Sequence, residues 1–127
     1  MAYLADTHVL LWASEEPENL SKKARKALED GTRPVWFSIA SVWEVAVKIR
    51  LKKLKLDGSV TEWVRALQNH GFQLLPIQPS HTETVSVLPL HHRDPFDRLL
   101  IAQAMGEDLE VITSDRAFKR YPVSVVW

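Results

Sequence analysis

The chain has 127 residues, no cysteine, and sixteen basic residues against sixteen acidic ones. This length provides one hydrophobic core, so we expect a single domain over residues 1–127, and the lack of cysteine excludes disulfide scaffolds, thiolate zinc sites and cysteine nucleophiles. The balanced charge argues against a domain that binds nucleic acid through bulk electrostatics, but it allows an enzyme with a local basic patch.

Short apolar segments alternate with amphipathic stretches along the chain. Apolar runs bounded by turn residues predict strands at 3–6, 34–37, 72–75, 110–113 and 123–126. Apolar residues at helical spacing predict helices at 7–14, 21–30, 38–54, 60–70, 80–88 and 94–105, with a helical turn at 115–119. Because strands that alternate with helices form βαβ units, the expected fold is a three-layer α/β/α domain with a short, mostly parallel central sheet.

The first residues of the chain lack the features of an export signal. Asp6 and His8 interrupt the apolar stretch near the N-terminus, and no basic segment precedes it, unlike the pattern of a signal peptide. No apolar run reaches the roughly 18 to 20 residues that span a bilayer. We therefore expect a cytoplasmic protein.

Four carboxylates fall at the ends of predicted strands or at the starts of helices. Asp6 ends the first strand, and Asp115 follows the fourth. Glu44 lies in the second turn of a helix and Asp97 in the first turn of another. Ligands of an open α/β sheet bind outside the carboxyl ends of its strands, so we expect these four side chains to meet at one edge.

Each acid also has a structural explanation. Asp6 and Asp115 stand at positions that favour helix N-caps. Ser41 and Glu44 have the spacing of a capping box, and the proline before Asp97 is typical of a helix start. Together, however, four carboxylates at one edge repel one another unless a cation lies between them. Oxygen ligands favour Mg²⁺ or Mn²⁺, ions that polarise phosphodiesters, so the pattern indicates phosphoryl chemistry.

Other phosphoryl-transfer sites and a zinc site fit the sequence poorly. The chain has no Gly-x-x-x-x-Gly-Lys-Ser/Thr segment, and its four scattered glycines form no dinucleotide fingerprint. His91 and His92 are adjacent, so we expect their side chains to point apart rather than to one metal ion. The other histidines are isolated, and each histidine is interpreted as a surface or hydrogen-bonded residue.

Several sequence blocks together resemble the PIN domain and, more narrowly, the VapC-type toxins of bacterial type II toxin–antitoxin pairs. The blocks are Asp6-Thr-His8, Ser41-Val-Trp-Glu-Val-Ala-Val-Lys48, the run from His92 to Ala104, and Ile112-Thr-Ser-Asp115 with Phe118 and Tyr121. They occur in the expected order over nearly the whole chain. The most specific part is His-Arg-Asp-Pro-Phe-Asp-Arg.

The resemblance implies a Mg²⁺- or Mn²⁺-dependent ribonuclease that hydrolyses RNA phosphodiester bonds and is inhibited by a cognate VapB-like antitoxin. Carried over to this chain, the metal-binding and catalytic acids are Asp6, Glu44, Asp97 and Asp115. Asp6 and Asp97 are expected to hold the principal ion, while Glu44 and Asp115 orient its waters or a second ion. Members of the family also commonly form homodimers.

Further residues receive supporting roles from the resemblance and from their positions. Those expected beside the acids are Thr7, Asp94, Thr113 and Ser114. The candidate phosphate contacts are Lys48, Arg50 and Arg98. Trp12, in the helix after Asp6, and Trp43, next to Glu44, are candidates to line an apolar groove for an antitoxin segment.

Two alternatives remain open at this point. One is a PIN-type nuclease that acts in RNA processing or on DNA and has no antitoxin. The other is a non-enzymatic binding module in which the acids are only helix caps.

Overall fold

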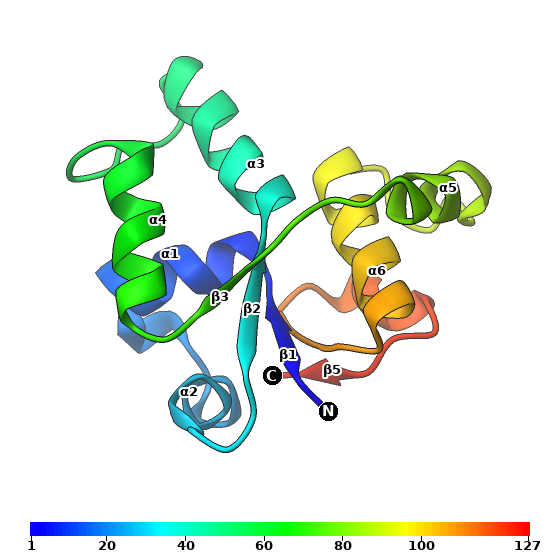
Figure 1. Ribbon diagram of the computed structural model, residues 1–127, viewed down its shortest axis with the longest axis horizontal. Helices are drawn as coiled ribbons and strands as arrows, with labels where there is room; N and C mark the ends of the chain where they lie inside the picture. The colour runs from blue at the N-terminus through cyan, green and yellow to red at the C-terminus, as the bar shows by residue number, and fades with distance from the viewer.

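The apolar segments of the sequence form five parallel strands in the order β3-β2-β1-β4-β5, as the computed structural model of residues 1–127 shows (Figure 1). The strands are β1 (Tyr3–Ala5), β2 (Val35–Ser38), β3 (Gln73–Leu75), β4 (Glu110–Ile112) and β5 (Val125–Val126). Because every pairing is parallel, all five carboxyl ends lie at the same edge of the sheet.

Helices connect the strands and cover both faces of the sheet, which confirms the predicted α/β fold. They are α1 (Thr7–Glu15), α2 (Lys22–Glu29), α3 (Ile39–Arg50), α4 (Val60–Asn69), α5 (Pro79–Val87) and α6 (Pro95–Glu107), with the short 3₁₀ helices η1 (Pro17–Asn19) and η2 (Arg116–Arg120). None of the helices combines the length and the apolar character needed to cross a membrane.

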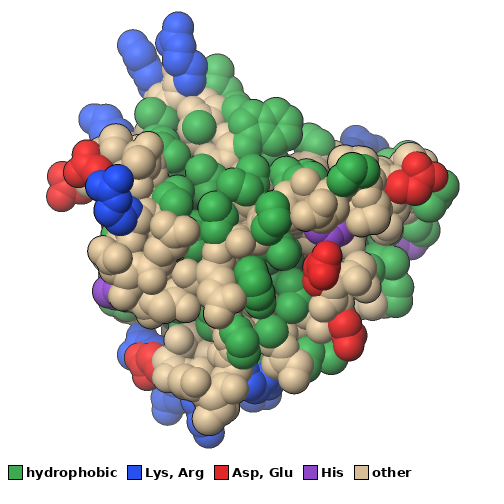
Figure 2. All heavy atoms as spheres, in the orientation of Figure 1, with side chains coloured by type: hydrophobic (Ala, Val, Ile, Leu, Met, Phe, Trp, Pro, Cys, Tyr) green, Lys and Arg blue, Asp and Glu red, His purple; other side chains and the backbone are tan.

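The alternation of side chains along β1 separates two hydrophobic clusters. Tyr3 and Ala5 point to one cluster, which also receives buried side chains of α1, α2 and α4, while Leu4 points to the other, which α6 and η2 complete. In Figure 1, α1, α2 and α4 accordingly lie on one side of the strands and α5 and α6 on the other. Hydrophobic side chains remain visible down the middle of the face drawn in Figure 2.

Some helix starts follow the predicted caps and others do not. Ser21 caps α2 by accepting from the backbone N–H of Ala24, at 3.0 Å. The predicted capping box of Ser41 and Glu44 is wrong, because Ser38 caps α3 and Ser41 lies inside the helix. Ser80 likewise lies inside α5, which begins at Pro79.

Two predicted elements are shorter than expected. The helix predicted over 38–54 ends at Arg50, because Lys52 adopts a left-handed backbone conformation with φ of 61°. The sequence does not indicate this turn, because no glycine or proline stands there. The last strand covers only Val125–Val126 instead of 123–126.

Candidate metal centre

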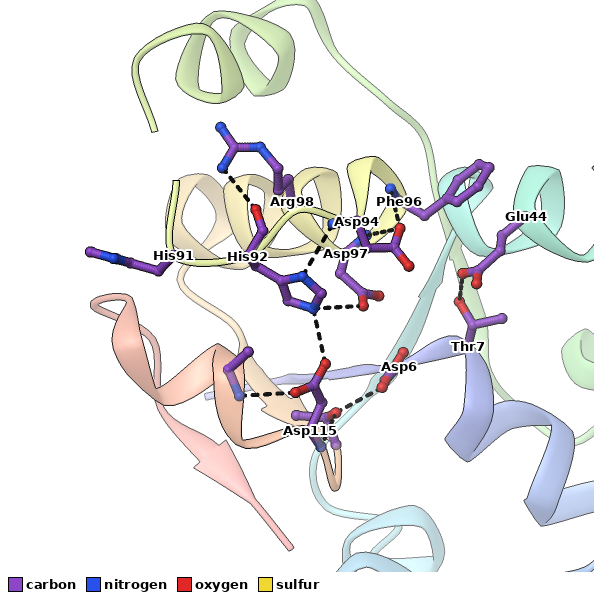
Figure 3. Close-up of polar contacts among 12 residues, drawn as sticks. Asp6, Thr7, Glu44, His91, His92, Asp94, Phe96, Asp97, Arg98 and Asp115 are labelled. Carbon is purple, nitrogen blue, oxygen red and sulfur yellow. Dashed lines mark hydrogen bonds and ion pairs between the residues drawn. The ribbon is translucent and has the colours of Figure 1, made fainter. Parts of the chain in front are cut away.

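Four acids reach the carboxyl edge of the sheet from four separate elements (Figure 3). Asp6 directly follows β1, and Asp115 stands at the start of η2, three residues after β4 ends. Glu44 projects from the second turn of α3 and Asp97 from the first turn of α6. Asp6 and Glu44 are buried, at 4% and 2% exposure.

Asp6 is not a helix cap, although it stands at the N-cap position of α1, because its side chain makes no capping hydrogen bond. Its Oδ2 atom accepts a hydrogen bond of 2.7 Å from the hydroxyl of Thr113. Its Oδ1 atom is buried and has no hydrogen-bond partner. Burial raises the pKa of Asp6, as does the nearby charge of Glu44, although the Thr113 hydrogen bond opposes the shift.

Glu44 is held by a hydroxyl and an ammonium group. Thr7 Oγ1 lies 2.8 Å from both Glu44 Oε1 and Ser41 Oγ, so it donates to the carboxylate and accepts from the serine. Lys48, one helical turn further along α3, contacts Glu44 Oε2 at 2.5 Å. Partial burial lowers the pKa of Lys48, but the hydrogen bond and charge of Glu44 outweigh this and the net shift is upward.

Asp97 lies among the other carboxylates of the cluster and is partly buried. Burial, followed by the neighbouring carboxylates of Asp6, Asp94, Glu44 and Asp115, raises the pKa of Asp97 to about 8. In the metal-free protein Asp97 is therefore largely protonated at neutral pH, since a proton supplies the positive charge that the cluster lacks.

Asp115 serves both as a helix cap and as a member of the cluster. Its Oδ1 atom accepts from the backbone N–H of Ala117 at 2.9 Å, which caps η2. Its own backbone N–H donates to Thr113 Oγ1 at 3.0 Å. The same hydroxyl that donates to Asp6 thus accepts from Asp115, so Thr113 links two of the acids.

His92 contacts two of the acids, although the sequence alone gives it no role beside them. Its Nε2 atom lies 2.9 Å from Asp115 Oδ2 and 3.0 Å from Asp97 Oδ2. The expectation that His91 and His92 point apart is correct, because His91 stacks on Tyr121 at 5.2 Å between ring centroids. The ring of His92 nevertheless reaches two of the acids. Its position five residues before Asp97 is the feature of the sequence that could have indicated this contact.

The predicted supporting residues divide into two groups. Thr7 and Thr113 contact acids directly, and Asp94 caps α6 by accepting from the backbone N–H of Phe96 at 2.9 Å. Ser114 is exposed and makes none of the hydrogen bonds of the cluster, so the structure does not place it beside an acid.

Of the three predicted phosphate contacts, only Lys48 is paired with one of the four acids. Lys48 lies beside Glu44, and Arg50 is exposed at the end of α3. Arg98 is buried, and its guanidinium donates to backbone carbonyls that include Leu88 and Pro89, at 3.0 Å each. The prediction that Arg98 contacts phosphate is therefore wrong: its donors hold a loop instead.

The donor set fits a hard divalent cation. It consists of carboxylate oxygens, one of them buried without a partner, and Lys48 is the only lysine or arginine paired with one of the four acids. Oxygen ligands of this kind suit Mg²⁺ or Mn²⁺ rather than softer metals. A cation here would take the place of the proton that Asp97 otherwise retains.

Comparisons with known proteins agree with this geometry. Residues 3–123 match the PIN domain family. The chain is 34% identical over 128 residues to Ribonuclease VapC22 of Mycobacterium tuberculosis, and the match covers 98% of this chain and 97% of the relative.

Solved structures share the fold at low sequence identity. A VapBC2 complex from Rickettsia felis bound to a promoter DNA fragment matches with a TM-score of 0.74 and 15% identity, covering 98% of this chain and 97% of that one. A toxin–antitoxin complex from Klebsiella pneumoniae matches with a TM-score of 0.67 and 22% identity, covering 99% and 97%. Because it matches the family model over residues 3–123 and the mycobacterial ribonuclease over nearly its whole length, this chain belongs to the PIN domain family.

Proposed function

We propose that this chain is a Mg²⁺- or Mn²⁺-dependent endoribonuclease and the toxin of a type II toxin–antitoxin pair. The observation that carries the proposal is the convergence of Asp6, Glu44, Asp97 and Asp115 at one sheet edge, with a buried carboxylate oxygen that has no partner. The ribonuclease that is 34% identical over nearly the whole chain supports the same activity.

In this proposal each acid has a defined task. Asp6 and Asp97 hold the principal ion, and Glu44 and Asp115 orient its waters or a second ion. When bound, the ion polarises the scissile phosphate and lowers the pKa of the attacking water. Thr113 keeps Asp6 in place from one side, while Thr7 keeps Glu44 in place from the other.

Two cations are the proposed contacts for the RNA backbone. Lys48 stands beside Glu44 with its side chain 34% exposed, whereas Arg50 is exposed at the last residue of α3, on a different face of the helix. An ammonium group next to the acids, and a guanidinium group further along the same helix, attract phosphate without reading sequence. These contacts therefore position RNA but do not select its bases.

The proposed antitoxin partner has a candidate groove next to the acids. A cavity of about 350 Å³ lies between α1 and α3, and its lining includes Trp12, Leu11 and Lys48. Trp43 does not line this cavity. The solved neighbours from Rickettsia felis and Klebsiella pneumoniae are themselves toxin–antitoxin complexes.

We also propose a homodimer, for which an exposed apolar surface on α3 and α6 is available. Trp43 is 56% exposed and packs edge-on against Phe96, at 4.9 Å between ring centroids, and Ile39 on the same helix is 36% exposed. Burying such side chains stabilises an interface. Light scattering of the purified protein measures the oligomeric state, and a Trp43→Ala variant should shift it towards the monomer.

The decisive experiment compares Asp97→Asn with wild type on RNA and on DNA of the same sequence, with Mn²⁺ and with a chelator. We expect wild type to cleave RNA only with the metal, and the folded variant to cleave neither substrate. Asp57→Asn, an exposed acid outside the cluster, is the matched control and should retain full activity. Undiminished cleavage by Asp97→Asn, or cleavage of DNA in preference to RNA, would contradict the proposal.

A further inference from the structure

The loop between α5 and α6 is fixed by two buried side chains. Arg98 donates to the backbone carbonyls of Leu88 and Pro89, at 3.0 Å each. The Tyr121 hydroxyl accepts from the backbone N–H of His92 at 2.9 Å and donates to the Pro89 carbonyl at 2.7 Å. The backbone at His92 is therefore held in one place from two sides.

The imidazole ring of His92 is also fixed in orientation. Its Nδ1 atom accepts from the backbone N–H of Asp94 at 3.2 Å, and its ring meets Phe118 edge-on, at 6.0 Å between centroids. A neutral imidazole whose Nδ1 atom accepts a hydrogen bond carries its proton on Nε2. The Nε2 atom is then a donor, with no lone pair to offer a metal ion.

The Nε2 atom hydrogen-bonds to one acid, Asp115, and lies within ion-pair distance of a second acid, Asp97, from another element. It lies 2.9 Å from Asp115 Oδ2 and 3.0 Å from Asp97 Oδ2, and takes up only one oxygen of each carboxylate (Figure 3). Two carboxylates side by side repel each other. A donor that binds Asp115 and lies 3.0 Å from Asp97 reduces this repulsion and keeps the two groups together at the edge of the sheet.

We propose that His92 is a positioning residue, which holds Asp97 and Asp115 ready for the cation through Nε2–H and is not itself a metal ligand. This inference rests on the metal centre proposed above. Outer partners of metal ligands typically contribute 10- to 100-fold to metal affinity because they orient the ligating atoms.

His81 shows the same hydrogen-bonding pattern without a cluster. Its Nδ1 atom accepts from the backbone N–H of Gln78 at 2.9 Å, and its Nε2 atom contacts Glu107 at 2.9 Å. That ring joins α5 to a single carboxylate near the end of α6. His92 differs from His81 in contacting two carboxylates, Asp97 in α6 and Asp115 at the start of η2.

The test is a calorimetric titration of Mn²⁺ into the metal-stripped wild type and into variants of the loop. We expect His92→Ala to lower the Mn²⁺ affinity by about 10-fold or more. His92→Gln, whose side-chain amide can supply an N–H donor, should recover part of the loss. His91→Ala removes the neighbouring ring, which contacts no acid of the centre, and should bind like wild type.

A spectroscopic measurement separates positioning from ligation. With ¹⁵N-labelled histidine and bound Mn²⁺, pulsed electron paramagnetic resonance should show no directly coordinated nitrogen, and ¹⁵N chemical shifts of the metal-free protein should report the Nε2–H form of His92. A coordinated imidazole nitrogen would overturn the inference, as would unchanged or tighter Mn²⁺ binding by folded His92→Ala.

The same titration distinguishes this inference from the proposed function. If Mn²⁺ binding is lost in Asp97→Asn but unchanged in His92→Ala, the metal centre stands and the role of His92 is refuted. If the wild type itself does not bind Mn²⁺, the metal centre and the role of His92 are contradicted together.

Discussion

The acid cluster has two unlike halves. Asp6 and Glu44 are buried and are held by hydroxyl groups of residues in or next to regular elements. The side chains of Asp97 and Asp115 are 14% and 39% exposed, and both contact His92 on the loop between α5 and α6. One half is therefore built into the core, while the other depends on how firmly a loop is anchored.

Strand pairing explains the buried half. Ala5 and Ile112, the last residues of β1 and β4, are paired. Asp6 and Thr113 directly follow these two residues and are therefore close together. A hydroxyl donor satisfies a carboxylate oxygen but supplies no net charge. Burial therefore still raises the pKa of Asp6, and the Thr113 hydrogen bond opposes this shift only in part.

The largest difference between the halves should appear in catalysis. We expect Asp6→Asn to lower the rate of RNA cleavage by more than about 100-fold, because no water can replace a ligand at that buried position. Asp115→Asn should cost less, since water reaches the more exposed group. Single-turnover cleavage rates at saturating Mn²⁺ measure both, with thermal melting as the control for folding. Equal losses in the two variants would remove the distinction.

Thr113→Val tests how firmly the buried half is held. The variant loses the donor to Asp6 and the acceptor for the backbone N–H of Asp115, and leaves a buried carboxylate oxygen unsatisfied. We expect the free energy of unfolding to fall by about 1 to 3 kcal/mol, measured by urea denaturation of the metal-free protein. Thr113→Ser keeps the hydroxyl and should lose much less. A stability equal to wild type for Thr113→Val would show that the link is unimportant.

The raised pKa of Asp97 predicts a specific dependence of stability on pH. In the unfolded chain the group ionises near its usual pKa of 3.8, and in the folded metal-free protein near 8. Between these values the folded state binds more protons than the unfolded state, so stability falls as the pH rises through this window. We expect the Tm of the metal-free protein to fall by at least several degrees between pH 5 and pH 8, and we expect added Mn²⁺ to reverse this fall.

The control for this pH effect is Asp97→Asn, which cannot take up the proton. Its Tm should vary less over the same range, although Asp6, whose pKa is also raised, still contributes in the same direction. A wild-type Tm that rises from pH 5 to pH 8 without metal would contradict the assignment of the proton to these acids.

The smallest effect is expected at Ser114. The side chain is exposed and takes no part in the hydrogen bonds of the cluster. Ser114→Ala should change the free energy of unfolding by less than about 0.5 kcal/mol, as is usual for exposed positions. It should also leave Mn²⁺ binding intact. A clear loss of metal affinity would restore the supporting role that the sequence predicted for this residue.

Local sequence signals predicted much of the fold and the location of the acids. Ser21 and Asp94 cap helices by accepting hydrogen bonds from residues two or three positions later. Because these contacts are local, the sequence alone can predict them. The parallel arrangement followed from the alternation of strands and helices. Because parallel strands end at one edge, the convergence of Asp6 and Asp115 followed from the same pattern.

Contacts between distant segments were not predictable in this way. Arg98 looks like a surface cation in the sequence, yet its acceptors are carbonyl groups of a preceding loop whose path depends on the packing of α5 against α6. The sequence predicts no role for His92 at the acids, because it stands beside His91, yet its partners include Asp115, 23 residues away. Such roles depend on tertiary geometry, and neighbouring sequence does not reveal them.

Asp6 and Thr113 are 107 residues apart in the chain, and they meet only because β1 is paired with β4. Contacts between such distant segments require long loops to close, which makes them slow to form compared with local helices. A nascent chain that ends before β4 lacks both Thr113 and Asp115 and leaves one side of β1 without its partner. The capacity of the proposed nuclease to cleave RNA is thereby tied to the final stages of synthesis, and we expect a chain that ends before β4 to be inactive on RNA.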